Sequence, residues 1–133
     1  MQERKFFLCA KCKNLVGMIH DAGVPLYCCG QPMEALNMNT SSGAAEKHLP
    51  IVTKSGYRVT VNAGAAAHPM EDAHHIDWIY LQTKHGGQRK HLSPGAAPTA
   101  HFVLTEDDEP VAAYAYCNLH GVWKSDKIEE VNG

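Results

Sequence analysis

The chain has 133 residues, of which 44% are hydrophobic and 20% charged, and its formal net charge is −2 at pH 7. This is the balance of an ordinary globular protein, and it offers no basic stripe that would favour nucleic acid or an anionic membrane as a partner. The apolar runs are too short to span a bilayer, and the first residues lack the apolar core of a secretory signal, so we expect a cytoplasmic protein.

Residues 1–37 form a first block of short apolar stretches interrupted by Gly23, Pro25, Gly30 and Pro32. This pattern predicts a few short strands joined by tight turns. A piece of this size cannot bury a sufficient apolar core by itself, so it needs a metal ion or a partner subunit. Residues 38–45 are small and polar, and we interpret them as a linker.

Residues 46–133 have the pattern of a β-sandwich. YRVTVNAG (57–64) alternates apolar and polar residues, and HIDWIYLQT (75–83), HFVLT (101–105) and VAAYAYC (111–117) are rich in β-branched and aromatic residues or small apolar ones. Turn signals recur between them at KSG, HGG, SPG and EDDEP. Short strands at this spacing predict an antiparallel sandwich, so we expect an all-β chain with two domains.

The first block contains four of the five cysteines of the chain. Cys9 and Cys12 have the C-x-x-C spacing of a knuckle that presents two thiolates to one metal ion, whereas Cys28 and Cys29 are adjacent. A disulfide between the neighbours Cys28 and Cys29 would be strained. We therefore predict a tetrahedral four-thiolate site that suits zinc or iron, and spacing alone leaves a structural zinc site as an alternative.

The fifth cysteine, Cys117, precedes His120 in the segment CNLHGVW, and other histidines occur in EKHLP (His48) and HPMEDAHHIDW. Together they form a plausible mixed nitrogen–sulfur metal site on the sandwich. The latter segment offers His68, His74 and His75, but neighbours in an extended chain face opposite sides, so His74 and His75 cannot both be ligands. His20, His85, His91 and His101 have no companion ligand and are interpreted as exposed or packing residues.

The donor set of this second site indicates which metal it binds. C-x-x-H also occurs in blue-copper sandwiches, but no methionine follows His120 to serve as the axial ligand. Four imidazoles and one thiolate exceed the usual copper set and suit a five-coordinate iron with an open sixth position.

The motifs CAKCKN, YCCGQPM, EKHLP, HPMEDAHHIDWI and CNLHGVWK occur in one order, and the chain resembles desulfoferrodoxin, the two-iron form of superoxide reductase. The resemblance implies a desulforedoxin-like, rubredoxin-type domain (1–37), a linker (38–45) and an immunoglobulin-like antiparallel sandwich (46–133). It implies two iron ions per chain. The first would be bound by Cys9, Cys12, Cys28 and Cys29, and the catalytic one by His48, His68, His74, His120 and Cys117.

The same resemblance implies one-electron reduction of superoxide to hydrogen peroxide, with Glu46 and Lys47 in a mobile loop beside the open iron position. It also implies a homodimer and an external donor such as rubredoxin. Two alternatives stay open: a two-iron electron carrier without superoxide chemistry, and a zinc-stabilised binding module with incidental histidines. One departure is visible, since Lys13 stands where the family commonly has glycine after the knuckle, at a position that often needs a positive φ.

Overall fold

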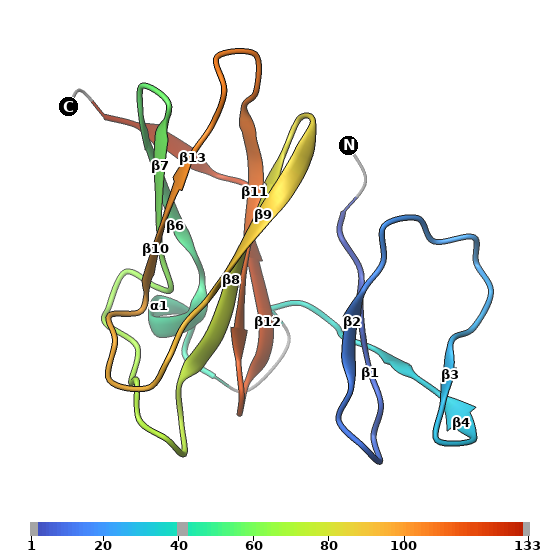
Figure 1. The fold of residues 1–133 in the computed structure, drawn as a ribbon. Helices are drawn as coiled ribbons and strands as arrows, with labels where there is room; N and C mark the ends of the chain where they lie inside the picture. The colour runs from blue at the N-terminus through green and yellow to red at the C-terminus, as the bar shows by residue number, and fades with distance from the viewer. Residues whose placement is uncertain (1–2, 40–42, 132–133) are drawn as a thin grey trace. The chain divides into compact units, whose positions relative to one another are not determined.

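The computed structural model describes residues 3–39 and 43–131, so residues 40–42 of the predicted linker lie outside the described residues. The chain divides into two compact units, Met1–Asn37 and Met38–Gly133. Within the described residues the regular structure consists of thirteen short strands and one four-residue helix, which confirms the predicted all-β fold class (Figure 1). None of the helical structure in these ranges is long and apolar enough to cross a membrane.

The first unit is a set of very short strands. β1 (Phe6–Leu8) lies between β2 (Leu15–Gly17) and β5 (Glu34–Ala35), with antiparallel pairing on both sides, and β3 (Tyr27–Cys28) pairs with β4 (Gln31–Pro32). Phe6 and Cys9 are the buried apolar residues of this unit in the part of the chain that the structure describes. Such a small core needs a further cross-link, as the sequence predicts.

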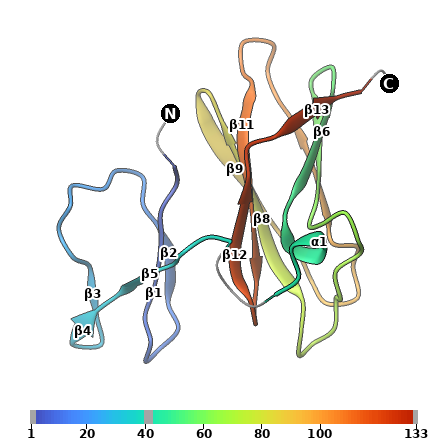
Figure 2. The same cartoon turned by 180° about the vertical axis from the view of Figure 1, so that it is seen from behind.

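The second unit is a sandwich of two four-stranded sheets (Figures 1 and 2). The strand order is β10-β7-β6-β13 in one sheet and β12-β11-β8-β9 in the other. All pairs are antiparallel except β13, which runs parallel to β6. The strands are β6 (Ile51–Ser55), β7 (Arg58–Asn62), β8 (Ile76–Thr83), β9 (Gly86–His91), β10 (Thr99–Val103), β11 (Pro110–Cys117), β12 (Gly121–Ser125) and β13 (Ile128–Glu130).

The core of the sandwich follows the alternation seen in the sequence. Val59 and Val61 of β7 are fully buried, whereas Arg58 is exposed and Thr60 half-buried. In the facing sheet the core-directed positions of β8 pair with small residues of β11, which leaves room for the larger side chains between the sheets; the pairs are Leu81 with Ala113, Ile79 with Ala115 and Ile76 with Cys117. The sulfur of Cys117 therefore belongs to the end of the apolar core.

A β-bulge marks the point where the core meets Cys117. Tyr116 pairs with Trp78, but Cys117 pairs with Ile76, so β8 has one extra residue, Asp77, at this position. A bulge of this kind bends its strand and redirects side chains, and bulges are common beside functional sites. Because of the extra residue, both Ile76 and Cys117 stay on the buried face.

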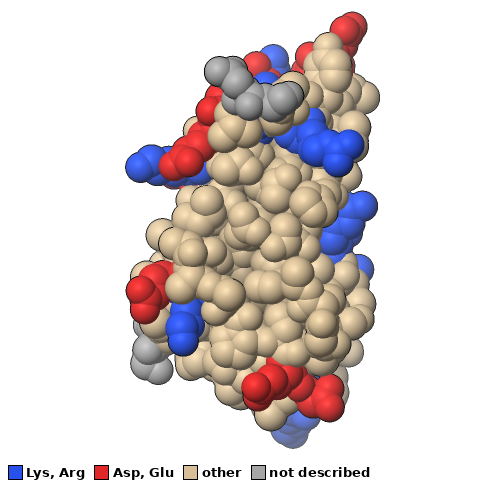
Figure 3. Space-filling view, turned by 90° about the vertical axis from the view of Figure 1, so that its left-hand side faces the viewer, with Lys and Arg blue, Asp and Glu red and all other residues tan. Residues whose placement is uncertain are grey.

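The outer face of the sheet that contains β7 and β10 is largely uncharged. Figure 3 shows this side of the sandwich, with Lys, Arg, Asp and Glu scattered toward its margins and uncharged residues over its middle. Hydrogen bonds join the two strands across this face, from Thr99 to Asn62 (2.7 Å) and between Thr60 and His101 (3.2 Å).

The short helix α1 (Ala45–His48) begins inside the segment that the sequence predicts as a linker. Its turn is closed by hydrogen bonds from Lys47 N to Ala44 O (3.1 Å) and from Leu49 N to Ala45 O (2.8 Å). The backbone of α1 rests directly on Gly64, and Ala66 N donates to Glu46 O (2.7 Å). A residue without a Cβ is required at position 64, because this approach leaves no room for a side chain.

We expect Gly64→Ala to destabilise the sandwich by about 1–3 kcal/mol, the usual range for overpacking. The added Cβ would overlap the carbonyl carbon of Lys47 and lie 2.5 Å from the carbonyl oxygen of Glu46. Denaturant unfolding measures the effect. Gly86→Ala is the control, since its Cβ would meet nothing within 4 Å. Equal unfolding free energies for the two variants would contradict the close packing of α1.

Candidate metal centres

The first candidate centre consists of the four cysteines of the first unit, whose sulfur atoms all lie within 4.8 Å of one another. The Cys12 and Cys28 sulfurs are 3.5 Å apart, and those of Cys28 and Cys29 are 4.0 Å apart. Sulfur ligands at about 2.3 Å from a tetrahedral metal are about 3.8 Å from each other. The four thiols are thus spaced to bind a single metal ion.

Two turns with unusual backbone conformations present these sulfurs. In the knuckle, Lys13 N donates to Cys9 O (2.9 Å) and Lys13 has a φ of 67°, which is the positive φ that the sequence predicts at this position. In the second turn, Cys29 has a φ of 52°. Neighbours in an extended strand point to opposite sides, and this left-handed residue is what lets Cys28 and Cys29 face the same point.

The pKa values of Cys9 and Cys29 are shifted in opposite directions. The backbone N–H of Cys12, which lies 3.4 Å from the Cys9 sulfur, is the main cause that lowers the pKa of Cys9 to about 6. The nearby thiols of Cys12 and Cys9 raise the pKa of Cys29 to about 12. Like charges at this separation cannot all form without compensation, so a cation is needed to hold four thiolates together.

The second candidate centre lies at one end of the sandwich and gathers residues from four places in the chain. Ligand atoms of His48, His74, Cys117 and His120 lie within 4.8 Å of one another. His68 adjoins this group through its Nε2, which is 2.9 Å from the Nε2 of His48. The structure thereby brings together all five residues that the sequence nominates for the second site.

The rings of His48 and His68 are oriented with unprotonated nitrogens toward the centre. His48 Nδ1 donates to Ala44 O (2.7 Å) and His68 Nδ1 donates to Pro69 O (2.6 Å), so the Nε2 of each neutral ring has a lone pair rather than a proton. His120 Nδ1 lies 3.1 Å from His48 Nε2. The facing Nε2 lone pairs of His48 and His68, 2.9 Å apart, repel unless they share a cation.

The Nε2 of His74 is buried and has no hydrogen-bond partner within residues 3–39 and 43–131. A buried polar atom without a partner usually costs free energy or marks an absent ion. Together with the facing lone pairs of His48 and His68, this orphaned nitrogen fits a metal ion in the middle of the cluster.

Burial sets the charge state of the donors. Desolvation lowers the pKa of His48 and His74, and it lowers the pKa of His68 to about 4, so these rings are neutral and able to bind a metal. Desolvation also raises the pKa of Cys117, an effect that the backbone N–H groups of Leu119 and His120 partly offset. Cys117 is fully buried, and its thiolate therefore depends on a nearby cation.

Comparison with known proteins agrees with these two centres. A family model described as desulfoferrodoxin matches residues 40–126. The desulfoferrodoxin of Nitratidesulfovibrio vulgaris is 45% identical over 124 residues, which are 92% of this chain and 95% of that protein. This chain belongs to the desulfoferrodoxin family.

Solved structures agree with the fold of this desulfoferrodoxin-family protein. The superoxide reductase from Treponema pallidum matches with a TM-score of 0.80 and 41% sequence identity, over 93% of this chain and 99% of that one. A one-iron superoxide reductase (1Fe-SOR) from Giardia intestinalis matches with a TM-score of 0.51 and 34% identity, over 60% of this chain and 95% of that one. The architecture and the two donor sets fit a protein with two iron ions per chain.

Two residues that the sequence did not single out support the second centre. Trp123 stacks on His48 with ring centroids 5.1 Å apart, and its Nε1 donates to His120 O (3.1 Å). Gly43 lies against the same two rings, since a Cβ there would be 2.9 Å from His120 Cγ and from His48 Cε1. Trp123 stands in the motif CNLHGVWK and so had a sequence signal, whereas Gly43 is close to the rings only because of the tertiary fold.

The remaining histidines lie away from the cluster. The ring of His75 donates from Nδ1 to Glu71 O (3.0 Å), and its Nε2 faces Asp77 at 3.9 Å. This agrees with the expectation that only one of the neighbours His74 and His75 faces the metal. The other four are exposed, as expected; they are His20, His85, His91 and His101.

Glu46 and Lys47 are exposed in α1, immediately before His48. The resemblance implies a mobile loop here, and the structure shows a helical turn that is tied to Ala66 and packed on Gly64. Burial is the main cause that lowers the pKa of His48 and His74, and the charge of Lys47 is a smaller one, which indicates that this charge lies near the rings.

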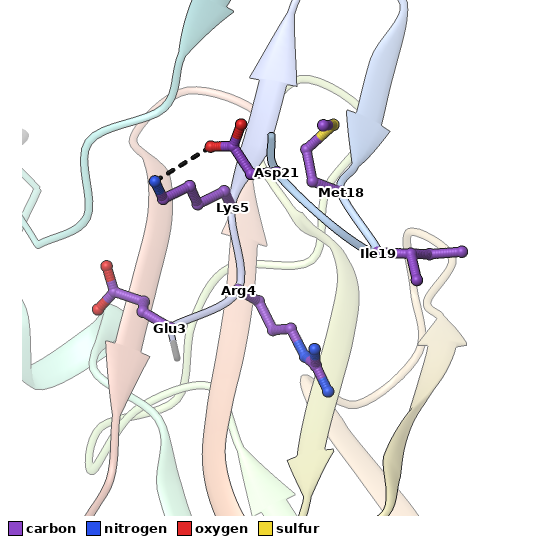
Figure 4. A pocket seen from close by; sticks show the side chains of 6 residues that line it. All are labelled: Glu3, Arg4, Lys5, Met18, Ile19 and Asp21. Atoms are coloured by element: carbon purple, nitrogen blue, oxygen red, sulfur yellow. Dashed lines mark hydrogen bonds and ion pairs between the residues drawn. The ribbon is translucent and has the colours of Figure 1, made fainter. Parts of the chain in front are cut away.

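The first unit also has a cavity of about 280 Å³, lined by Glu3, Arg4, Lys5, Met18, Ile19 and Asp21 (Figure 4). Lys5 Nζ pairs with Asp21 Oδ2 at 3.1 Å, and the backbone N–H of Gly23 together with Lys5 lowers the pKa of Asp21. The cavity lies at the start of β1, whereas Cys9 follows its end, so it is separate from the cysteine centre.

We expect Lys13→Gly to stabilise the first centre by up to about 1 kcal/mol, because a left-handed φ is unfavourable for a residue with a Cβ. The guanidinium concentration that bleaches the visible absorption of the cysteine-bound iron measures the effect. Lys11→Gly is the matched control in the same loop, and its φ is not positive. A midpoint for Lys13→Gly that falls as far as that of Lys11→Gly would contradict the strain at Lys13.

Proposed function

We propose that this chain is a superoxide reductase, which reduces superoxide by one electron to hydrogen peroxide at an iron ion bound by His48, His68, His74, His120 and Cys117. The observation that carries the proposal is the convergence of four imidazoles and one buried sulfur, with the buried Nε2 of His74 left without a hydrogen-bond partner in the described ranges. When bound, the iron supplies the electron. The reaction balances as one superoxide, one electron and two protons giving one hydrogen peroxide.

The donor set itself favours this chemistry. Neutral imidazoles leave the charge of a ferrous ion reduced only by the Cys117 thiolate, so the centre stays positive and attracts an anion. The Cys117 thiolate donates electron density to the metal, as thiolate ligands do in haem enzymes. Its burial excludes water from the sulfur.

Lys47 and Glu46 are the proposed catalytic residues beside the open position. Lys47 brings a positive charge near His48 and His74, and we propose that it attracts superoxide and orders a water that donates protons. Glu46 precedes it in the same turn of α1, and we propose that its carboxylate displaces the product. In the absence of such roles, an exposed pair of this kind contributes little.

The domain boundaries, the role of the first iron and the electron donor are proposed from the family resemblance. We propose that residues 1–37 form the domain of the first iron, bound by Cys9, Cys12, Cys28 and Cys29, that residues 38–45 are a linker and that residues 46–133 are the catalytic domain. The first iron would relay or store electrons or stabilise its small domain, with rubredoxin or a similar protein as donor. Five cysteines that act as metal ligands suit the reducing cytoplasm.

A homodimer is proposed on the surface of the first unit. Ile19, Val24 and Tyr27 are 98%, 71% and 69% exposed, an unusual share of large apolar side chains for so small a unit. An apolar cavity of about 400 Å³ lies beside Tyr27 and is lined by Asn14, Val16, Met18, Leu26, Tyr27, Cys28 and Met33. A second copy of the chain would cover this surface.

If this surface forms the dimer, Ile19→Glu should shift the protein to monomers, because a charge would then be buried without a partner. Sedimentation velocity measures the change. Val103→Glu, at a residue that is 66% exposed on the sandwich, should leave the dimer unchanged. A dimer that persists in Ile19→Glu but dissociates in Val103→Glu would place the interface elsewhere.

The proposed function predicts one hydrogen peroxide per superoxide consumed when an external reductant is supplied. A dismutase gives one per two, and an electron carrier consumes none. Cys117→Ser should abolish turnover and leave the first iron in place, since it removes the sulfur donor of the second site alone. Peroxide production retained by Cys117→Ser, or zinc in the second centre of the purified protein, would contradict the proposal.

Lys47→Ile should slow the capture of superoxide by about 10-fold at low salt and flatten the dependence of the rate on ionic strength, because electrostatic attraction is lost. Pulse radiolysis measures this rate. Lys84→Ile, which removes the same charge from the turn between β8 and β9, is the control and should leave the rate near that of the unmodified protein. An unchanged rate for Lys47→Ile at low salt would remove the role of Lys47.

A further inference from the structure

His74 is attached to the second centre differently from His48 and His68. The rings of His48 and His68 are each fixed by a hydrogen bond from Nδ1 to a backbone carbonyl. No hydrogen bond holds the ring of His74 in this way: its Nε2 is buried without a partner in the described ranges, and its ring contacts are with the other candidate ligands His48, His68 and His120. The position of the His74 ring among these imidazoles therefore depends on the backbone on either side of it.

That backbone forms a closed turn. Glu71 N donates to His74 O (2.9 Å) and His74 N donates to Glu71 O (3.1 Å). These bonds hold the turn together internally, but they do not fix it relative to the other ligands. The β8–β11 ladder holds one side of the turn, because Ile76 pairs with Cys117 at the end of β11. The other side, at Ala73, needs a second contact with the segment that carries Cys117 and His120.

The second contact is made by Asn118, which directly follows Cys117. Its side-chain Nδ2 donates to Ala73 O (3.0 Å), its side-chain Oδ1 accepts from His75 N (2.9 Å), and its backbone N donates to His75 O (3.2 Å). The three bonds reach the residues on both sides of His74. An asparagine suits this place because one amide group both donates and accepts.

The position of Asn118 is itself well fixed. It lies between Cys117, whose pairing with Ile76 and Gly121 ends β11, and His120, which precedes β12. Movement of the 71–75 turn relative to Cys117 and His120 would break the bonds of Asn118. The amide therefore couples the segment that holds one ligand to the segment that holds two others.

We propose that Asn118 is a positioning residue that holds His74 in place relative to Cys117 and His120 and thereby tunes metal binding at the second centre. This inference rests on the proposed metal ligands, but not on the reaction. Residues that orient the metal ligands without binding the metal themselves commonly change metal affinity by about 10- to 100-fold when they are removed. Because Asn118 is exposed, water can replace its bonds after truncation, so a smaller effect on folding is expected.

The test compares Asn118→Leu and Asn118→Asp in the full chain loaded with iron. Leucine keeps the size of the side chain but removes both hydrogen bonds, whereas aspartate keeps the oxygen that accepts from His75 N. We expect Asn118→Leu to lose iron from the second centre to a chelator about 10- to 100-fold faster, and Asn118→Asp to be intermediate. The visible absorption of the cysteine-bound iron serves as an internal control and should be unchanged.

A second readout follows the backbone directly. Hydrogen exchange of the His75 amide should become faster in Asn118→Leu, while the Glu71 amide, which donates within the turn, should change less. Asp108→Ala is the control, because Asp108 accepts bonds from Thr83, His85 and Glu109 at the opposite end of β8. It should leave iron release from the second centre and exchange of the His75 amide unchanged.

Two outcomes would overturn the proposal: release of the second iron at the original rate in Asn118→Leu, or equal loss of iron from both centres, which indicates general destabilisation. If the unmodified protein does not reduce superoxide but Asn118→Leu still loses its second iron selectively, the proposed function fails and the positioning role stands.

Discussion

The second centre brings together nitrogen and sulfur donors whose lone pairs only a shared cation can satisfy. The Nε2 atoms of His48 and His68 face each other at 2.9 Å, each with a lone pair, and the Nε2 of His74 is buried without a partner. The Cys117 sulfur lies at the end of the same group, where burial opposes its ionisation. These arrangements raise the free energy of the metal-free protein, and a bound metal ion would remove that cost. Metal binding is thereby coupled to the ordering of the four chain segments that carry the donors.

The sandwich supplies the rigidity that such a centre needs. The bulge at Asp77 keeps Cys117 on the buried face of β11, and Gly64 lets the backbone of α1 come close enough to present His48. Trp123 then fixes two ligands from one side chain by stacking on His48 and bonding to the carbonyl of His120. Donors held in this way would bind a metal ion without a large rearrangement.

The two centres differ in how they are built. The cysteine centre comes from two turns within one small unit, where left-handed residues Lys13 and Cys29 orient the sulfurs, and its geometry is local. The histidine–cysteine centre joins residues up to 72 positions apart, as in the contact between His48 and His120. The first centre compensates for a small apolar core, whereas the second is positioned by a large one.

The sequence by itself determined the fold class, the family and the residue types of both donor sets, because spacing such as C-x-x-C and the period of Val59 and Val61 are local properties of a chain. It also indicated the positive φ at Lys13, and it indicated that only one of the neighbours His74 and His75 is a ligand. The tertiary structure decided how Gly43, Gly64, Asn118 and Trp123 support the second centre, and it showed that Glu46 and Lys47 lie in a helical turn. These features arise from close approaches between distant segments, and no local pattern of residues encodes the distance at which two folded segments meet.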